Sequence, residues 1–185
     1  MALIKGRKTV NDRWQLLELA TAGEMPAVPF EAGAAEALPV VPPTGDVIVP
    51  LAAWRAQRGE LLARSGGLGV WLSGADDLAE IAQDLGHFGV IAVRFPSFTD
   101  GRGYSTGRLL RQRYGWRGEL RAIGDVQRDQ LFYLARCGFD AFDLRPAENV
   151  DVALEAFTDF SEAYQASVER PLPLFRRREV ASSGA

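Results

Sequence analysis

Apolar runs alternate with amphipathic segments along most of the chain, and this alternation predicts repeated βα units. Short apolar runs predict buried strands at 46–49, 68–72, 89–95, 119–123 and 139–144. Apolar residues at helical spacing predict helices at 50–64, 75–85, 105–114, 126–136 and 150–168. Strands that alternate with helices of this length are typical of a parallel sheet. We therefore expect an α/β fold with a mostly parallel sheet of about four or five strands, as an open sheet or a partial barrel.

The same pattern divides the chain into four segments. Residues 1–19 predict an N-terminal β-hairpin with its turn at Asn11-Asp12. Residues 20–45 are rich in Pro, Ala and Gly, which favours an irregular connector. Residues 46–169 hold the α/β domain, and residues 170–185 are expected to form a flexible tail.

Composition narrows the class of protein. Of 185 residues, 47% are hydrophobic and 24% are charged, which is ordinary for a soluble globular domain. The net charge of −3 argues against nucleic acid as a partner. No apolar run approaches the roughly 20 residues that span a bilayer, and the first residues lack the apolar core of a signal peptide. We expect a cytoplasmic protein that binds no membrane.

Single cysteine and histidine residues exclude several chemistries. Cys137 and His87 are the only residues of their types, so this chain alone cannot form a disulfide, ligate an iron–sulfur cluster or build a Cys/His zinc site. Residues 103–107 match the G-x-S-x-G pattern of a serine hydrolase, but that fold needs a histidine after the serine. We therefore interpret Ser105 as a helix N-cap. No metal site is expected, and redox chemistry would require an organic cofactor or a partner protein.

Arginines are concentrated in one part of the chain. The segment from residue 94 to residue 136 contains nine arginines and four acidic residues, which gives it a net charge of +5. One interpretation is solvated helix faces with ion pairs. The other is a site for a small oxyanion, because the guanidinium fork matches carboxylate, phosphate and sulfur oxyanions.

A loop rich in glycine and arginine follows the strand at 89–95. Loops at the carboxyl ends of parallel strands converge on one edge of the sheet, where α/β proteins bind ligands, and helix N-termini there favour anions. Arg145 follows the strand at 139–144 on the same edge. No catalytic residue can be assigned, so enzymatic activity stays open. The candidate anion- or ligand-binding residues are Arg94, Ser97, Asp100, Gly101, Arg102, Gly103, Tyr104, Ser105, Arg108, Asp125 and Arg128.

The glycines of this loop also approach a dinucleotide-binding fingerprint. Gly101, Gly103 and Gly107 have the required order, but the last spacing is one residue too long. Asp125 follows the next strand, where a ribose-binding acid would lie. One interpretation of these glycines is that they bind a flavin or nicotinamide nucleotide. The other is that they only allow the loop to turn tightly.

Long stretches of the chain resemble a known bacterial family. The segments are Arg94-Phe-Pro-Ser-Phe-Thr-Asp-Gly-Arg-Gly-Tyr-Ser105, Gly118-Glu-Leu-Arg-Ala-Ile-Gly-Asp-Val126 and Arg136-Cys-Gly-Phe-Asp-Ala-Phe142. They resemble the bacterial domain-of-unknown-function 934 family, described as a probable oxidoreductase involved in sulfite reduction. The resemblance covers roughly residues 45–145 and implies a role in sulfur assimilation.

The chemistry of the chain limits what this resemblance implies. Without iron–sulfur ligands, an accessory protein is a better expectation than the sulfite reductase itself. It would bind a small oxyanion or dock on sulfite reductase through the Arg/Gly-rich loop. One alternative is an oxidoreductase with a nucleotide cofactor at the same edge. Another is a non-catalytic scaffold in which Phe98 and Tyr104 face a partner. Opposite charges on different faces would also permit a homo-oligomer.

Overall fold

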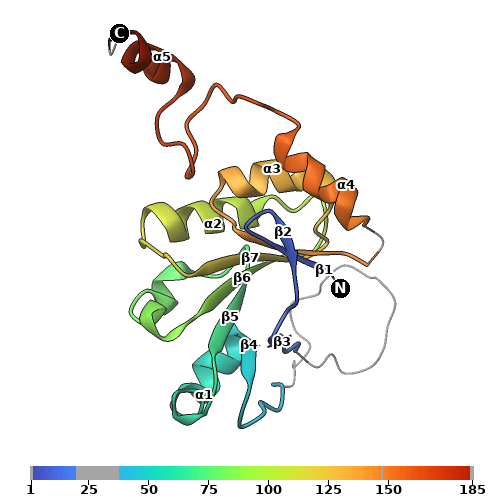
Figure 1. The fold of residues 1–185 in the computed structure, drawn as a ribbon. Helices are drawn as coiled ribbons and strands as arrows, with labels where there is room; N and C mark the ends of the chain where they lie inside the picture. The colour runs from blue at the N-terminus through green and yellow to red at the C-terminus, as the bar shows by residue number, and fades with distance from the viewer. Residues whose placement is uncertain (1, 20–37, 147, 184–185) are drawn as a thin grey trace.

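The computed structural model describes residues 2–19, 38–146 and 148–183, and within them all strands belong to one sheet (Figure 1). Its order is β2-β1-β8-β7-β6-β5-β4-β3. The strands are β1 (Ala2–Lys5), β2 (Lys8–Val10), β3 (Trp14–Leu16), β4 (Asp46–Pro50), β5 (Leu68–Ser73), β6 (Val90–Phe95), β7 (Glu119–Gly124) and β8 (Ala141–Leu144).

The sheet is an open, curled half-barrel of mixed orientation. Strands β3 to β8 run parallel to one another, whereas β1 pairs antiparallel with β8 and β2 pairs antiparallel with β1. The α/β class and the predicted strands β4 to β8 are confirmed. The expectation of four or five mostly parallel strands was wrong. The described residues form eight strands of mixed orientation, because the N-terminal residues add β1, β2 and β3.

The N-terminal segment contributes to both edges of the sheet. The hairpin turn lies at Gly6-Arg7, with φ of 56° and 62°, and not at Asn11-Asp12. After β2, residues 11–13 lead directly to β3 at the opposite edge. The Cα atoms of Val10 and Trp14 are four residue steps apart and so separated by at most about 14 Å. This short crossover segment, residues 11–13, therefore requires the sheet to curl, and Figure 1 shows the blue chain passing from β2 to β3.

The helices are α1 (Leu51–Ala63), α2 (Arg102–Gln112), α3 (Arg128–Arg136), α4 (Val150–Glu155) and α5 (Leu174–Ser183), with 3₁₀ turns η1 (Leu78–Ile81), η2 (Leu85–His87) and η3 (Ala156–Thr158). Helices α1 to α4 cover the convex face of the sheet, and α5 lies apart from it. The main core packs α1 to α4 on alternate strand residues such as Val70, Val93 and Leu120. None of the helices among the described residues is long and apolar enough to cross a membrane.

The concave face carries a smaller apolar cluster, formed by the other strand residues. Trp71, Val90, Ala92 and Ile123 belong to it, and Trp14 from β3 packs against it. Parallel strands are usually covered on both faces. Here the N-terminal segment covers part of the second face.

Two predicted helices differ from the structure. The segment 75–85 forms the 3₁₀ turns η1 and η2, because Asp76 and Asp77 accept hydrogen bonds from the backbone N–H groups of Ser73 and Ala79 and so favour turns. The predicted helix at 150–168 ends early, as α4 followed by η3. Phe160 and Tyr164 of its apolar stripe are 63% and 68% exposed, so the stripe extends beyond the core that it was expected to cover.

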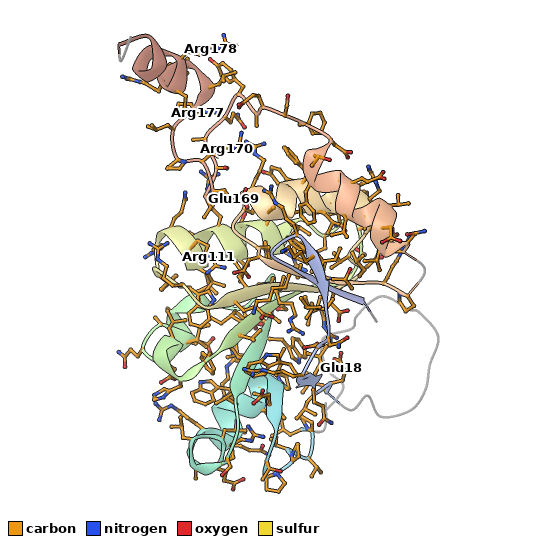
Figure 2. All side chains as sticks on the ribbon, in the orientation of Figure 1. Glu18, Arg111, Glu169, Arg170, Arg177 and Arg178 are labelled. Atoms are coloured by element: carbon orange, nitrogen blue, oxygen red, sulfur yellow. The ribbon has the colours of Figure 1, made fainter. Side chains whose placement is uncertain are left out.

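The C-terminal segment leads away from the body and ends in α5, inside the predicted flexible tail. Glu162 forms ion pairs with Arg170 and Arg177 along it. Figure 2 shows these arginines along the C-terminal segment, away from Glu18 beside the sheet. Of the predicted connector at 20–45, residues 20–37 lie outside the described residues.

Candidate functional site

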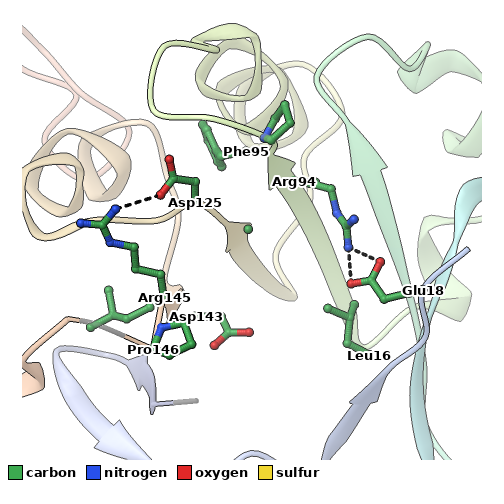
Figure 3. Close-up of a pocket in the computed structure, with 11 residues that line it drawn as sticks. Leu16, Glu18, Arg94, Phe95, Asp125, Asp143, Arg145 and Pro146 are labelled. Carbon is green, nitrogen blue, oxygen red and sulfur yellow. Dashed lines mark hydrogen bonds and ion pairs between the residues drawn. The ribbon is translucent and has the colours of Figure 1, made fainter. Parts of the chain in front are cut away.

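A pocket of about 360 Å³ opens at the carboxyl ends of β6, β7 and β8 (Figure 3). The curl of the sheet also brings the end of β3 to this rim. Parallel strands gather their following loops at one edge, which is where half-open and closed α/β barrels hold ligands. The lining residues are Leu16, Glu18, Arg94, Phe95, Pro96, Gly124, Asp125, Asp143, Leu144, Arg145 and Pro146.

Arg94 supplies one polar wall of the pocket. Its guanidinium lies over the Trp71 ring, 4.3 Å from the ring centroid, and its Nη2 donates to both carboxylate oxygens of Glu18. The Nε atom is buried and donates to no acceptor among the described residues. The aromatic ring holds the guanidinium in place and excludes water from one of its sides. Arg94 is therefore a fixed cation with unused hydrogen-bond donors.

Asp125 and Arg145 form the opposite wall. The Asp125 carboxylate accepts hydrogen bonds from the Phe98 backbone N–H and from Gln127 Nε2, both at 3.0 Å. Arg145 Nη1 lies 3.5 Å from Asp125 Oδ1, and its Nε donates to Glu148 at 3.0 Å. Asp125 therefore ties the loop that contains Phe98 to the rim of the pocket.

Asp143 on β8 lies between the two walls (Figure 3). No donor in the described part of the chain forms a hydrogen bond or ion pair with its carboxylate. Burial raises the pKa of Asp143, and the nearby Arg121 guanidinium only partly opposes this effect. The pocket thus has two guanidinium groups and three carboxylates, and Asp143 is the carboxylate that no described residue pairs with.

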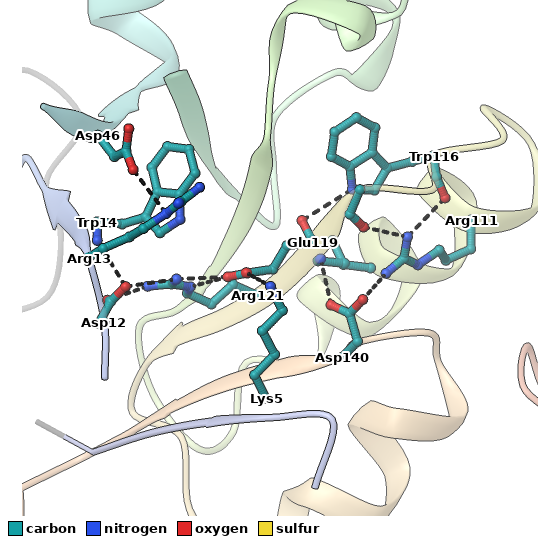
Figure 4. Close-up of polar contacts among 12 residues, drawn as sticks. Lys5, Asp12, Arg13, Trp14, Asp46, Arg111, Trp116, Glu119, Arg121 and Asp140 are labelled. Atoms are coloured by element: carbon teal, nitrogen blue, oxygen red, sulfur yellow. Dashed lines mark hydrogen bonds and ion pairs between the residues drawn. The ribbon is translucent and has the colours of Figure 1, made fainter. Parts of the chain in front are cut away.

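A buried ionic network lies on the concave face toward the amino ends of the strands (Figure 4). Arg121 on β7 is only 2% exposed. It donates to Asp12 at 2.6 Å and to Glu119 at 2.8 Å, and Glu119 also pairs with Lys5 at 2.6 Å. Burial lowers the pKa of Arg121, but the two carboxylates outweigh it and leave that pKa above its usual value. The network fastens the crossover segment to the middle of the sheet.

Of the predicted site residues, the structure brings Arg94 and Asp125 together at the pocket, along with Arg145. The others lie outside its lining. Arg102 pairs with Asp100, whose pKa is lowered by hydrogen bonds from the Arg102 side chain and backbone. The remaining polar residues are also engaged elsewhere: Ser97 contacts Thr99, Arg108 donates to Gln112, and Arg128 pairs with Asp159 and Asp129.

The glycines of the loop serve packing. A Cβ atom on Gly103 would lie 2.7 Å from the Phe95 ring, and one on Gly107 would lie 2.3 Å from the Phe139 ring. Both glycines lie on the face of α2 that rests on the sheet, which explains their i, i+4 spacing. Tyr104 packs edge-on against Phe95, and burial raises its pKa.

The first residues of α2 also differ from expectation. The helix begins at Arg102 with Gly101 as its N-cap, so Ser105 is not the N-cap. Ser105 is an exposed residue within the first turns of the helix. The expected cap was wrong because the Asp100 carboxylate already accepts the hydrogen bond of the Arg102 backbone N–H.

The sequence did not single out two of the charged residues of the pocket, Glu18 and Asp143. Asp143 could have been found, since a carboxylate on the alternating positions of a predicted buried strand is unusual. Glu18 carries no such signal, because its place depends on β3 joining the far edge of the sheet.

Neither the curated proteins nor the solved structures contain a match to the chain. A family model does match residues 69–175, more than half of the chain, from β5 to the first residues of α5. The matched region includes Arg94, Asp125, Asp143 and Arg145. The chain therefore belongs to the family described as bacterial protein of unknown function (DUF934).

Proposed function

We propose that this chain is a cytoplasmic accessory protein of assimilatory sulfite reduction, which binds a small oxyanion in the pocket and docks on sulfite reductase. The link to sulfite reduction rests on the family resemblance. The observation that carries the binding site is Arg94, held on the Trp71 ring at the carboxyl edge of the sheet. A fixed guanidinium in a partly dehydrated pocket is the side chain best suited to an oxyanion.

The Glu18 carboxylate occupies the position beside Arg94 Nη2 at which the oxyanion would bind. It engages Arg94 through Nη2 alone, and the Glu18 side chain is 52% exposed. An exposed ion pair of this kind contributes little free energy. An incoming oxyanion can therefore displace Glu18 at low cost, and Glu18 acts as an internal competitor for Arg94.

The loop beside the pocket supports the docking half of the proposal. Phe98 is 51% exposed at its tip, and its backbone N–H donates to Asp125 on the pocket rim. A bound oxyanion that draws Arg145 away from Asp125 would alter the support of this loop. Exposed aromatic side chains are enriched at the centres of protein interfaces.

Calorimetric titration with sulfite under nitrogen tests the binding site. We expect the wild-type chain to bind and Arg94→Ala to lose at least about tenfold in affinity, because a charge-assisted hydrogen bond is removed. Glu18→Gln should bind more tightly than the wild type. The matched control is Arg108→Ala, an exposed arginine on α2 that contacts Gln112. Equal affinity in the Arg94→Ala and wild-type chains would refute the site.

Affinity capture from sulfur-limited cells tests the docking. The tagged chain should retain sulfite reductase, and Phe98→Ala should retain less of it while keeping sulfite affinity. Capture without sulfite reductase under these conditions would contradict the accessory role.

A further inference from the structure

Arg94 and Asp143 lie in one row across the concave face. In the register of the sheet, Arg94 lies beside Ile123, and Ala122 lies beside Phe142, so Ile123 lies beside Asp143. Neighbouring strands are about 4.8 Å apart, which separates the Cα atoms of Arg94 and Asp143 by about 10 Å. Both side chains line the same pocket. A small tetrahedral or pyramidal anion in this pocket would have the Arg94 guanidinium on one side and the Asp143 carboxylate on the other.

Asp143 is the carboxylate of the pocket that accepts no hydrogen bond from the residues that the structure describes. Glu18 is engaged by Arg94, and Asp125 accepts from Phe98 and Gln127. Among the described residues, Arg121 is the cation that lowers the pKa of Asp143, but its hydrogen bonds go to Asp12 and Glu119. An ionised carboxylate can only accept hydrogen bonds. A ligand beside the ionised Asp143 carboxylate must therefore present a hydrogen.

We propose that the pocket selects oxyanions that keep a proton near neutral pH, such as hydrogen phosphate and hydrogen sulfite, and rejects sulfate. This inference rests on the proposed function. Arg94 binds the unprotonated oxygens, and Asp143 accepts the hydrogen bond of the protonated one. Sulfate carries no proton near neutral pH, so one of its oxygens would face the Asp143 carboxylate without a hydrogen between them. Repulsion of this kind is a common source of specificity.

Rejection of sulfate would serve a protein that takes part in sulfite reduction. A protein that works with sulfite reductase meets both the oxidised and the reduced sulfur oxyanions. The two have similar size, and a guanidinium alone would bind either of them. Sulfate and hydrogen sulfite differ in protonation state, and a carboxylate can distinguish them by this difference.

Calorimetric titrations of phosphate and sulfate into the full chain at neutral pH test the selectivity, with sulfite under nitrogen as a third ligand. The wild type should bind phosphate at least about tenfold more tightly than sulfate. In Asp143→Asn the ratio should fall toward one, mainly through a gain in sulfate affinity, because an amide can donate. Asp143→Ser, which also supplies a donor, should behave in the same way. Asp151→Asn, at an exposed position on α4, is the control and should keep the wild-type ratio.

The outcomes separate the two proposals. Equal wild-type affinity for phosphate and sulfate, or an unchanged ratio in both Asp143 variants, would overturn the selectivity and leave the oxyanion site standing. A wild-type chain that binds none of the three anions would overturn the proposed function and the selectivity with it. Circular dichroism of each variant verifies that the fold is intact.

Discussion

At the residue scale, Asp143 is a carboxylate that the fold accommodates at a cost. Burial disfavours its ionised form, and no hydrogen bond from the described residues compensates. Groups that lower stability in this way are frequent at binding sites, where the arrangement serves a ligand. This interpretation leads to a stability prediction that is independent of any ligand.

Asp143→Asn should make the folded chain more stable than the wild type near neutral pH. The native pKa of Asp143 is raised, so the native state binds more protons than the unfolded state between the two pKa values, and stability falls as the pH rises through this window. The advantage of the variant should therefore vanish toward about pH 4, near the ordinary aspartate pKa. Urea unfolding at the two pH values measures it. A variant that is less stable at neutral pH would contradict the account.

Arg121 should be the charged residue whose loss harms stability most. Arg121→Met removes the partner of Glu119, which is 6% exposed, and of Asp12. Removing one member of a buried ion pair costs about 3–5 kcal/mol, and we expect the lower end because Lys5 still contacts Glu119. Chemical denaturation measures the loss, and adding Glu119→Gln should restore part of it. Arg108→Met is the exposed control, and an equal loss there would contradict the prediction.

At the element scale, the position of α2 depends on two glycines whose spacing in the sequence resembles that of known functional motifs. Gly103 and Gly107 resemble a nucleophile elbow and a nucleotide-binding loop, but the structure places both against phenylalanine rings of the core. Their close approach brings α2 onto β6. Nucleotide binding at this edge remains a hypothesis without support from these two glycines.

Gly107→Ala should destabilise the chain by about 1–3 kcal/mol, because the new methyl group would overlap the Phe139 ring and overpack the core. The intrinsic preference of alanine for helices works in the opposite direction and is smaller. Gly59→Ala on α1 meets no atom within 4 Å and should be neutral or stabilising by up to about 1 kcal/mol. Thermal unfolding compares the two variants, and equal effects would contradict the packing role.

How far the sequence predicts these elements depends on how local their causes are. Strands β4 to β8 follow from short stretches rich in apolar residues and were located correctly. The turn at Gly6-Arg7 was missed because a positive φ at an arginine has no sequence signal. The placement of β3 was also missed, because it depends on contacts with residues far away in the chain. The helix expected at 150–168 failed because its apolar period continued beyond the sheet that it covers.

The candidate site was predicted in the same partial way. Arg94 was located because it lies near the carboxyl end of a predicted strand, and Asp125 because it directly follows one. Asp143 was overlooked on a predicted strand, whereas the place of Glu18 depends on the curl of the sheet. The charge of +5 between residues 94 and 136 left two interpretations open, solvated helix faces with ion pairs or an oxyanion site. Arg111 donates to the carbonyls of Trp116, Gly118 and Gly138, and Arg121 serves the buried network. Much of this charge therefore holds the fold together.

At the scale of the whole molecule, the curled sheet unites the network and the pocket. The crossover segment joins the edge strands and is fastened to β7 through Asp12 and Arg121. The same curl brings the end of β3, with Leu16 and Glu18, to the carboxyl ends of β6 and β8. A chain whose sheet stayed flat would not assemble this pocket. The proposed oxyanion site is thus a property of the complete half-barrel.

Growth on defined sulfur sources tests the central claim most directly. A strain that lacks this chain is supplied with the wild-type, Arg94→Ala or Arg108→Ala form, and growth is measured with sulfite or with sulfide as the only sulfur source. We expect Arg94→Ala to fail on sulfite and grow on sulfide, while the wild type and Arg108→Ala grow on both. Wild-type growth on sulfite with a folded Arg94→Ala chain would contradict a role for the pocket in sulfite reduction.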